Sequence, residues 1–294
     1  MTQSMDMGVS VVRRWQLAAA LKQLREQADL TQEQAIERLR SGPGTWSRSK
    51  LSRVENREHH VKPREVEQLL DAYGGADAAT RDGLVTLAAG SREREWWEGF
   101  GKDVPEILQP LLSLEAGLVA MRDFQSQLVH GLLQTADYAR ALVTSIHPGL
   151  FGPAELERRV AARMTRQQVL TRNNPPTLHF VLDETILQRL VGDRVVMHDQ
   201  LRKLRQVAEK PNVTIQVLPR DIGGSPGLYG PFSILTLPDP IPDIGYTEGA
   251  AGALYIEDRD RVRTWTLRFG MLTRLARSQE DSVDMIAEAM RGYR

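Results

Sequence analysis

The chain has 294 residues, a formal net charge of zero at pH 7 and no cysteine. This length suggests about two domains, and the lack of cysteine excludes disulfide frameworks, thiolate catalysis and thiolate zinc sites. The longest apolar runs are far shorter than a membrane span, and the first residues lack the charged segment and apolar core of a signal peptide. We therefore expect a soluble, cytoplasmic protein without membrane partners.

The zero net charge conceals a local basic region. Between positions 38 and 64 the chain carries eight lysines and arginines but only two glutamates, a local charge of +6 that the remainder of the chain balances. A local basic patch, rather than the charge of the whole chain, is what attracts nucleic acid. A solvated charged face is the commoner explanation of such a run, so the inference depends on the motif found in the same region.

Two short helices joined by a turn are predicted at residues 31–56. Thr31 and Gln34 have the capping-box pattern that starts a helix, and the sequence Ser-Gly-Pro-Gly at 41–44 ends it. Ser47 is a favourable N-cap for a second helix, whose apolar positions lie on one face. This is the pattern of a helix-turn-helix DNA reader.

The outer face of the second helix carries the side chains that a recognition helix uses. Arginines bond guanine edges, and hydroxyl and cationic groups bond phosphates. We expect contacts to base edges from Arg48, Ser49 and Arg53. We expect contacts to phosphates from Gln32, Lys50, Ser52 and Arg57.

Residues 13–74 resemble the Xre (phage-repressor-like) helix-turn-helix family. The matching sequences are LTQE at 30–33 and SKLSRVEN at 49–56. Two features depart from the family pattern: the turn is lengthened through residues 42–46, and Arg57 replaces the usual glycine.

This resemblance implies a salt bridge between Arg25 and Glu55, which would join the first helix to the recognition helix. A partly buried bidentate arginine–carboxylate pair holds two helices in register, so we treat both residues as structural. Because a single domain of this kind buries little surface on DNA, we expect a homodimer on double-stranded DNA, with two half-sites about one helical turn apart.

The domain boundaries follow from the patterns on either side of this motif. Residues 1–12 are expected to be disordered, and residues 13–90 to form an all-α domain of five helices. The charged segment 91–95 is predicted to be a linker. A larger second domain is predicted to cover residues 96–294.

The second domain has the alternating patterns of an α+β fold. Strands are predicted at residues 178–182, 213–218, 232–237, 244–248 and 253–257. Helices are predicted at residues 112–121, 124–143, 155–172, 185–191, 195–208, 260–276 and 278–290, with an interruption near His130. The helix at 155–172 carries five arginines, which we interpret as a solvated face or as a site for an acidic partner or anionic ligand.

Residues 96–291 resemble a domain of unknown function that follows Xre-type readers in actinobacterial regulators of the WhiJ kind, also called antitoxin-like. The matching sequences include VHGLLQTADYARA at 129–141, PNVTIQVLP at 211–219 and GPF at 230–232. His130 stands where this family usually has proline. The resemblance supplies no ligand.

One sequence motif is typical of hydrolases. Residues 223–227, Gly-Gly-Ser-Pro-Gly, match the nucleophile elbow, which needs a backbone N–H after the serine and a helix after the turn. Pro226 has no N–H, and the residues after it have a strand pattern, so we interpret the segment as a flexible loop. The six histidines show no metal-binding spacing, and no phosphate-binding loop is present. We therefore predict neither an enzyme nor a bound metal or cofactor.

These patterns predict a sequence-specific DNA-binding transcriptional regulator whose second domain senses a ligand or partner and supports dimerisation. The alternative is an antitoxin-like protein-interaction module that binds a small partner protein and regulates itself through its DNA-binding domain. Binding of a small-molecule effector is a third interpretation. The candidate ligand or partner region comprises His130, Gln134, Arg163, Arg166 and Tyr229.

Overall fold

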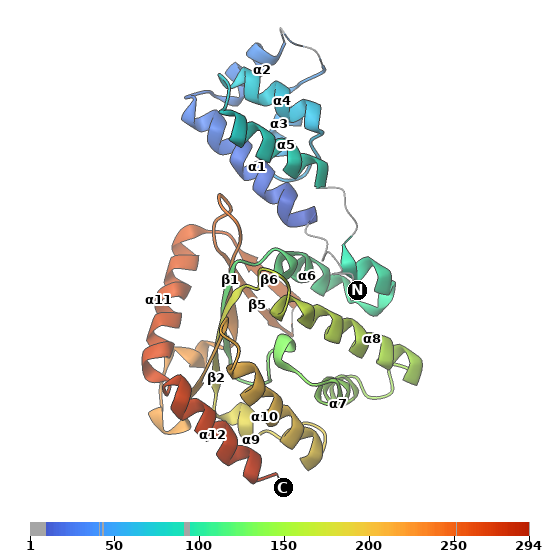
Figure 1. Cartoon of the computed structure of the whole chain (residues 1–294), viewed down its shortest axis with the longest axis vertical. Helices are drawn as coiled ribbons and strands as arrows, with labels where there is room; N and C mark the ends of the chain where they lie inside the picture. Colours follow the sequence, from blue (N-terminus) through green and yellow to red (C-terminus); the bar gives the residue numbers. More distant parts are fainter. Residues whose placement is uncertain (1–9, 41, 43, 91–94, 251, 294) are drawn as a thin grey trace. The chain divides into compact units, whose positions relative to one another are not determined.

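The computed structural model describes residues 10–40, 42, 44–90, 95–250 and 252–293 (Figure 1). They belong to two compact units. Of these described residues, the first unit contains those from 10 to 98 together with Leu237–Ile241, and the second contains those from 99 to 236 and from 242 to 293. Most of the predicted disordered segment and of the predicted linker lies outside the described residues.

All regular secondary structure in the described residues of the first unit is helical. Its described helices are α1 Ser10–Gln27, α2 Gln32–Leu39, α3 Arg48–Glu55, α4 Pro63–Ala72 and α5 Ala78–Gly90. Thr31 and Gln34 form the predicted capping box at the start of α2, and the Ser47 hydroxyl caps α3 by accepting from the backbone N–H of Lys50. The predicted helical fold is confirmed, although α1 begins at Ser10, before the expected start at residue 13.

A single apolar cluster joins these helices. Leu21 of α1, Ile36 of α2, Leu51 of α3 and Leu69 of α4 are all buried in it. Burying a leucine or isoleucine side chain stabilises a fold by about 1.5–3 kcal/mol. The core therefore determines which face of α3 points outward.

The second unit is built around a six-stranded mixed sheet. Its strands are β1 Ala120–Gln125, β2 Thr177–Asp183, β3 Val213–Leu218, β4 Phe232–Thr236, β5 Ile244–Gly249 and β6 Gly252–Ile256. Their order is β3-β2-β1-β4-β5-β6. The first three are parallel to one another, whereas β4, β5 and β6 pair in antiparallel fashion. β1 thus lies where the parallel half of the sheet meets the antiparallel half.

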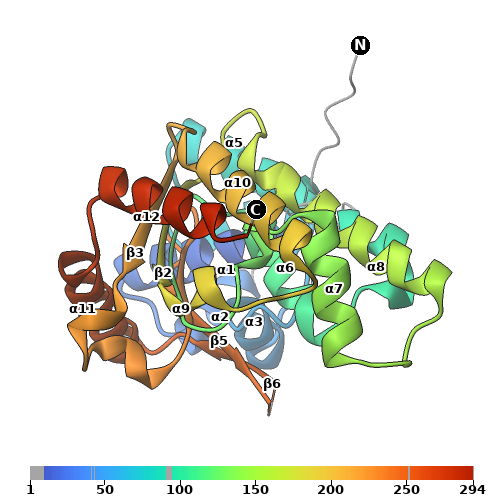
Figure 2. The same cartoon turned by 90° about the horizontal axis from the view of Figure 1, so that it is seen from below.

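Helices cover both faces of this sheet (Figure 1, Figure 2). One face is covered by α11 Arg259–Leu275, whose Phe269 and Leu272 pack with Phe124 and Phe232 of the sheet. The opposite face carries α6 Gln109–Ala116, α7 Ala136–Ile146, α8 Pro153–Arg166 and α10 Arg194–Ala208. The last helix, α12 Gln279–Arg291, packs against β3 and α10.

Short helical segments connect these elements. They are α9 Thr185–Gln188 and the 3-10 segments η1 Trp96–Asp103, η2 Glu106–Leu108, η3 Gly131–Leu133, η4 Gln167–Leu170, η5 Arg220–Ile222 and η6 Pro226–Tyr229. Within the described part of the chain, no helix combines the length and the apolar character that crossing a bilayer requires.

The five predicted strands are present, which confirms the α+β fold, but the central strand β1 was wrongly predicted as helix. The helices predicted at 112–121 and 124–143 overlap this strand at both ends. Its sequence has no β-branched residue, and the buried Asp123 hides the alternation of polar and apolar positions that marks a strand. The helix predicted at 155–172 ends at Arg166 and continues as η4.

Candidate nucleic-acid interface and ligand pocket

The outer face of α3 points to solvent because the apolar side chains of its inner face are held in the core. Arg48, Ser49 and Arg53, which we predicted to contact base edges, are all exposed. Arg53 forms no ion pair with any described residue. Arg48 pairs with Glu33 of α2 at 2.8 Å, but both side chains are more than half exposed, and such pairs contribute about 0–1 kcal/mol. The three side chains therefore share one accessible polar surface.

The lengthened turn before α3 is anchored to α4. The Trp46 indole N–H donates to Gln68 Oε1 at 2.8 Å, and the Lys50 ammonium lies 4.3 Å from the centre of the Trp46 ring. Lys50 also pairs with Glu65 at 2.5 Å. Burial alone would raise the pKa of the Glu65 carboxyl, but hydrogen bonds from Lys50 and from the backbone lower that pKa below its ordinary value. Lys50, predicted to contact phosphate, is thus already engaged inside the unit.

An ion pair between Arg25 and Glu55 joins α1 to the end of α3. Arg25 Nε and Nη2 donate to the two carboxylate oxygens of Glu55 at 2.6 and 2.9 Å, while Nη1 donates to the carbonyl of Leu30 at 2.6 Å. Both charged residues are 8% exposed. The bidentate geometry holds α3 at a defined angle to α1, so the pair positions α3, the helix predicted to contact DNA.

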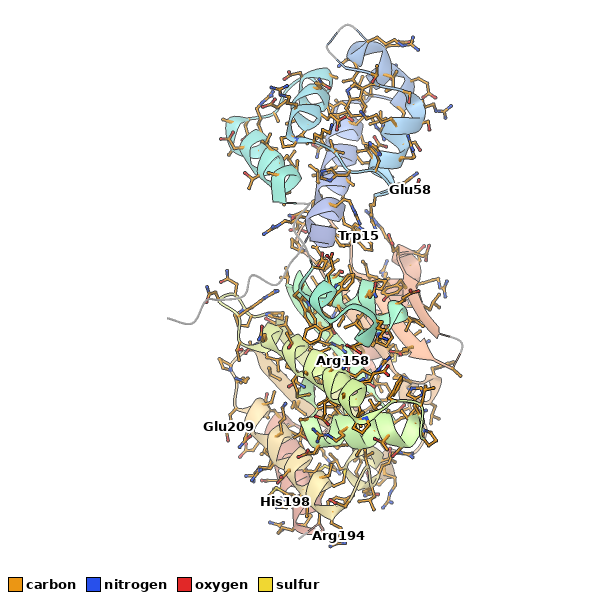
Figure 3. All side chains as sticks on the ribbon, turned by 90° about the vertical axis from the view of Figure 1, so that its right-hand side faces the viewer. Trp15, Glu58, Arg158, Arg194, His198 and Glu209 are labelled. Carbon is orange, nitrogen blue, oxygen red and sulfur yellow. The ribbon has the colours of Figure 1, made fainter. Side chains whose placement is uncertain are left out.

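The other residues predicted to contact phosphates differ in how they are held. The Gln32 amide donates to Glu55 Oε2 at 2.9 Å, which points it toward the ion pair. Ser52 is half-buried. Arg57 has a φ of 67°, in the left-handed region that favours glycine, and its guanidinium lies 4.5 Å from the centre of the Trp15 ring. Figure 3 shows Trp15 on α1, near the segment that follows α3.

In the second unit, the interpretation of the arginine-rich helix as a solvated face is wrong. Arg166 donates from Nε and Nη2 to both oxygens of Glu115, each at 2.5 Å, and both residues are buried. Arg163 donates from Nη1 to Gln134 Oε1 at 2.6 Å. Arg158, labelled on α8 in Figure 3, pairs with Asp103 at 2.6 Å. The arginines thus tie α8 to its neighbours because their partners come from other segments of the chain.

Gln134 connects several elements of this unit. Only 2% exposed, it accepts from Arg163 and donates from Nε2 to the carbonyl of Val129 at 2.7 Å. Its own backbone carbonyl accepts from Gln167 Nε2 at 2.8 Å and from Lys203 Nζ at 2.7 Å. Burial lowers the pKa of the Lys203 ammonium below its ordinary value. The side-chain amide and the backbone carbonyl of Gln134 therefore link α8, η4 and α10.

His130 and Asp123 form a buried titratable pair behind this network. His130 Nε2 lies 3.9 Å from Asp123 Oδ2, and its ring lies 5.3 Å from that of Phe180. Burial, followed by the positive charges of Arg166 and Arg163, lowers the pKa of His130 well below its ordinary value. Burial raises the pKa of the Asp123 carboxyl to about 7, although Ser233 Oγ donates to Oδ2 at 2.6 Å.

Two comparisons with known families agree with this architecture. Residues 16–84 match the model described as a helix-turn-helix domain. Residues 108–288, more than half of the chain, match the model described as a domain of unknown function, DUF5753. The chain belongs to the DUF5753 family. No curated protein and no solved structure matches it.

The DUF5753 domain contains a cavity of about 530 Å³ between α7, α8 and the segment before and within α6. Its lining is mainly apolar, and it includes Arg163 and Arg166 of the predicted ligand region. Neither Gln134 nor His130 lines the cavity, although Gln134 accepts a hydrogen bond from Arg163, which does. Sequence reasoning missed Glu115, Asp123 and Lys203, although acidic residues within apolar stretches of sequence are a signal that could have drawn attention to the first two.

Tyr229 does not join this group. It is 80% exposed on η6, where the Arg268 guanidinium of α11 lies 4.3 Å from its ring centre. The Ser225 hydroxyl accepts from the backbone N–H of Gly227 at 3.2 Å and so caps the 3-10 segment. The segment from Gly223 to Tyr229 continues into β4 rather than into a helix.

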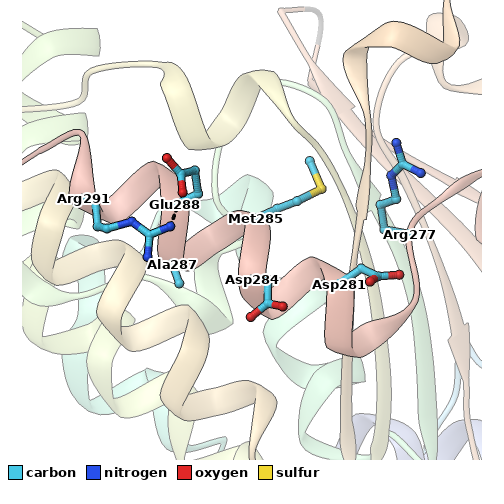
Figure 4. A pocket seen from close by; sticks show the side chains of 7 residues that line it. All are labelled: Arg277, Asp281, Asp284, Met285, Ala287, Glu288 and Arg291. Atoms are coloured by element: carbon cyan, nitrogen blue, oxygen red, sulfur yellow. Dashed lines mark hydrogen bonds and ion pairs between the residues drawn. The ribbon is translucent and has the colours of Figure 1, made fainter.

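A second hollow of about 560 Å³ lies along the outer side of α12 (Figure 4). Its lining carries three acidic residues with an arginine at each end, and Glu288 pairs with Arg291. Because its lining comes almost entirely from one exposed helix, we assign no ligand to it. Among the described residues, no group of three histidine or acidic side chains could hold a metal ion.

Proposed function

We propose that the chain is a sequence-specific DNA-binding transcriptional regulator. The observation that carries this proposal is the outward face of α3, where Arg48, Ser49 and Arg53 stand exposed on a helix whose other face is fixed in the core. A short helix presented in this way enters the major groove in helix-turn-helix proteins. We assign base contacts to these three residues.

Phosphate contacts are assigned to Ser52, Arg57, Gln32 and Lys50. Ser52 and Arg57 are half-exposed beside the same face. Gln32 and Lys50 would have to release Glu55 and Glu65, respectively, before reaching a phosphate. We therefore expect Gln32 and Lys50 to contribute less to operator affinity than their positions suggest.

We further propose that two copies of the chain bind one operator, as expected for a domain of this size. The experiment is a binding selection on random duplex DNA with the full chain at low and raised salt. A near-palindromic motif whose affinity falls steeply with salt supports a dimeric reader using phosphate contacts. Failure to enrich any sequence at either salt would refute the proposal, and light scattering of the complex would test the stoichiometry separately.

The DUF5753 domain is proposed to sense a ligand or partner and to support dimerisation, because its sequence resembles a domain that follows Xre-type readers in actinobacterial regulators of the WhiJ kind. We propose no catalytic role for it. The Ser225 hydroxyl is engaged as a cap, and the proline after it cannot supply an oxyanion donor.

The alternative function, an antitoxin-like module that binds a small partner protein, is favoured by the outer face of α11. Leu267, Met271 and Leu275 are 60%, 47% and 40% exposed at a spacing of four residues, and the exposed Arg263 and Arg274 flank them. Exposed apolar patches with a polar rim are typical of protein-binding surfaces. A small partner with an acidic, partly apolar face would fit this surface.

A double variant that introduces negative charge, Leu267→Glu with Met271→Glu, tests whether this face binds a small partner protein or a second copy of the chain. If the outer face of α11 binds a partner, the tagged full-length protein recovers a stoichiometric small protein from its host, whereas the tagged double variant does not. If it binds a second copy, light scattering shows the variant as a monomer while the wild type is a dimer. The partner hypothesis fails if the wild type recovers no stoichiometric protein.

A further inference from the structure

The walls of the cavity between α7 and α8 are suited to an apolar molecule. Leu108 and Leu112 line one side, and Leu142, Val143 and Ile146 of α7 line another. Ile146 is 55% exposed although it belongs to this lining, which shows that the cavity opens to solvent. Its volume of about 530 Å³ falls within the range of about 300–1,000 Å³ that holds small molecules in proteins, where apolar walls surround a few polar groups.

Arg163 is the cation in this cavity whose charge is not balanced. The other two arginines of the lining have carboxylate partners, Arg166 in Glu115 and Arg159 in Glu155. Among the described residues, Arg163 has only the neutral amide of Gln134, which accepts from Nη1. Burial lowers the pKa of Arg163 to about 10, so the guanidinium remains charged at neutral pH while most of its hydration is lost.

The free edge of this guanidinium has the geometry that receives a carboxylate. Nη1 is occupied, but Nε and Nη2 of Arg163 donate to no described residue. Neither nitrogen is among the buried polar atoms that lack a partner, so both remain accessible. The parallel N–H groups of Nε and Nη2 form the fork that binds a carboxylate through two hydrogen bonds.

The acidic groups near the cavity restrict the charge that a ligand can carry. Asp103 is already paired with Arg158 at 2.6 Å. Glu248 also lines the cavity and does not approach Arg163 closely enough to form an ion pair, and the Tyr246 hydroxyl donates to it at 2.9 Å. One unbalanced cation with an acidic residue nearby favours a ligand with one negative charge over one with two.

We propose that this cavity binds a small amphipathic carboxylic acid. The carboxylate pairs with the Nε–Nη2 edge of Arg163, and an aliphatic or aromatic body fills the apolar space between α7 and α8. This inference rests on the proposed sensing function of the DUF5753 domain, for which it names the class of effector. The ligand neutralises a charge that the protein leaves unbalanced, and it covers apolar side chains at the opening.

The test is equilibrium binding to the full chain by titration calorimetry, with decanoate and 4-phenylbutanoate as probes and decanol as the uncharged match for decanoate. Inorganic phosphate tests the preference for a monoanion with an apolar body. Arg163→Met removes the charge but keeps an unbranched side chain, and Arg202→Met, at an exposed arginine of α10, is the matched control. Arg163→Gln is a second variant in case the methionine perturbs the fold.

We expect at least one of the two acids to bind with a stoichiometry of one and at least tenfold more tightly than decanol or phosphate. Both Arg163 variants should lose at least tenfold in affinity for the acid and keep their affinity for decanol, whereas Arg202→Met should bind as the wild type does. The inference is overturned if neither acid binds more tightly than decanol, or if the Arg163 variants bind the acid as well as the wild type.

DNA binding by the same preparations keeps this test separate from the proposed function. A protein that selects an operator but binds neither acid overturns the effector assignment alone. A protein that binds an acid through Arg163 but selects no DNA, with or without the acid, overturns the DNA-reading function alone.

Discussion

Breaking the ion pair between Arg25 and Glu55 should destabilise the helix-turn-helix unit more than replacing the whole pair. Their side chains are 9% and 3% exposed and are joined by two hydrogen bonds. Arg25→Met leaves a buried carboxylate, and Glu55→Leu leaves a buried guanidinium. Removing one partner of a buried pair typically costs about 3–5 kcal/mol, whereas an apolar pair of similar volume is often nearly neutral.

The remaining local contacts reduce the expected loss of stability in both single variants. Glu55 keeps one hydrogen bond, from Gln32, when Arg25 is removed, and Arg25 keeps the carbonyl of Leu30 when Glu55 is removed. A retained hydrogen bond to a neutral group offsets only part of the stability lost with the ion pair, because an ordinary hydrogen bond contributes about 0.5–1.5 kcal/mol. We therefore expect each single variant to lose about 2–4 kcal/mol, and the double variant to lose much less than the sum.

The assay is native-state hydrogen exchange of the full chain, because the opening free energies of amides in α1 and α3 report on this unit alone. The four proteins of the cycle give the coupling energy directly. Operator affinity should fall in both single variants, although neither side chain is assigned a DNA contact. If the losses of the two single variants simply add in the double variant, the pair does not hold the helices together and our explanation of the geometry of α3 is incorrect.

Three further predictions concern single sites. Arg53→Ala should cost about 1–3 kcal/mol in operator affinity and relax selectivity at one base pair; a binding selection that returns the wild-type motif would contradict the base contact. Trp46→Phe removes the hydrogen bond to Gln68 and should cost about 0.5–1.5 kcal/mol of stability, measured by hydrogen exchange in α3. Burial raises the pKa of Asp123 to about 7, so the folded chain retains a proton there that the unfolded chain loses above about pH 4. The contribution of Asp123 to the free energy of unfolding therefore falls by roughly 4 kcal/mol as the pH rises from about 4 to about 7. His130, whose pKa is lowered mainly by burial, contributes stability that is instead lost as pH falls below about 6.5. The difference in free energy of unfolding between wild type and Asp123→Asn, measured at pH 5 and at pH 8, isolates the contribution of Asp123. A difference that is the same at both pH values would refute this prediction.

Structural features that depend on residues close together in the sequence could be predicted from it. The capping box of α2 and the Ser47 cap of α3 each depend on residues three positions apart, and the turn between them is marked by glycine. Because these local signals place the helix boundaries, the exposed face of α3 could be predicted. The alternation in β3 was equally local, since its buried and half-buried positions follow each other along the strand.

Contacts between residues far apart in the sequence could not be predicted from the residue pattern alone, and the ion pair between Arg25 and Glu55 was predicted only through the family resemblance. Arg163 and Arg166 lie three residues apart on one helix, and nothing in the sequence distinguishes them. Their environments differ because Glu115, 51 residues earlier, pairs with Arg166, whereas Arg163 meets only an amide. β1 was missed for a related reason, since its buried Asp123 is accommodated by Ser233 from β4, 110 residues later.

The unbalanced charge of Arg163 also suggests how a ligand in the cavity would affect the rest of the DUF5753 domain. Gln134 accepts from Arg163 through its side chain and from Lys203 of α10 through its backbone carbonyl. A carboxylate on the free edge of Arg163 would fix the guanidinium, and through Gln134 it would restrain α8 and α10 together. A ligand that binds only the folded form adds stability in proportion to the logarithm of its concentration. We therefore expect the layer of α7, α8 and α10 to respond to an anion through Arg163, because a bound anion would remove the cost of burying this guanidinium without a counter-ion, a cost that a fully paired core would not contain.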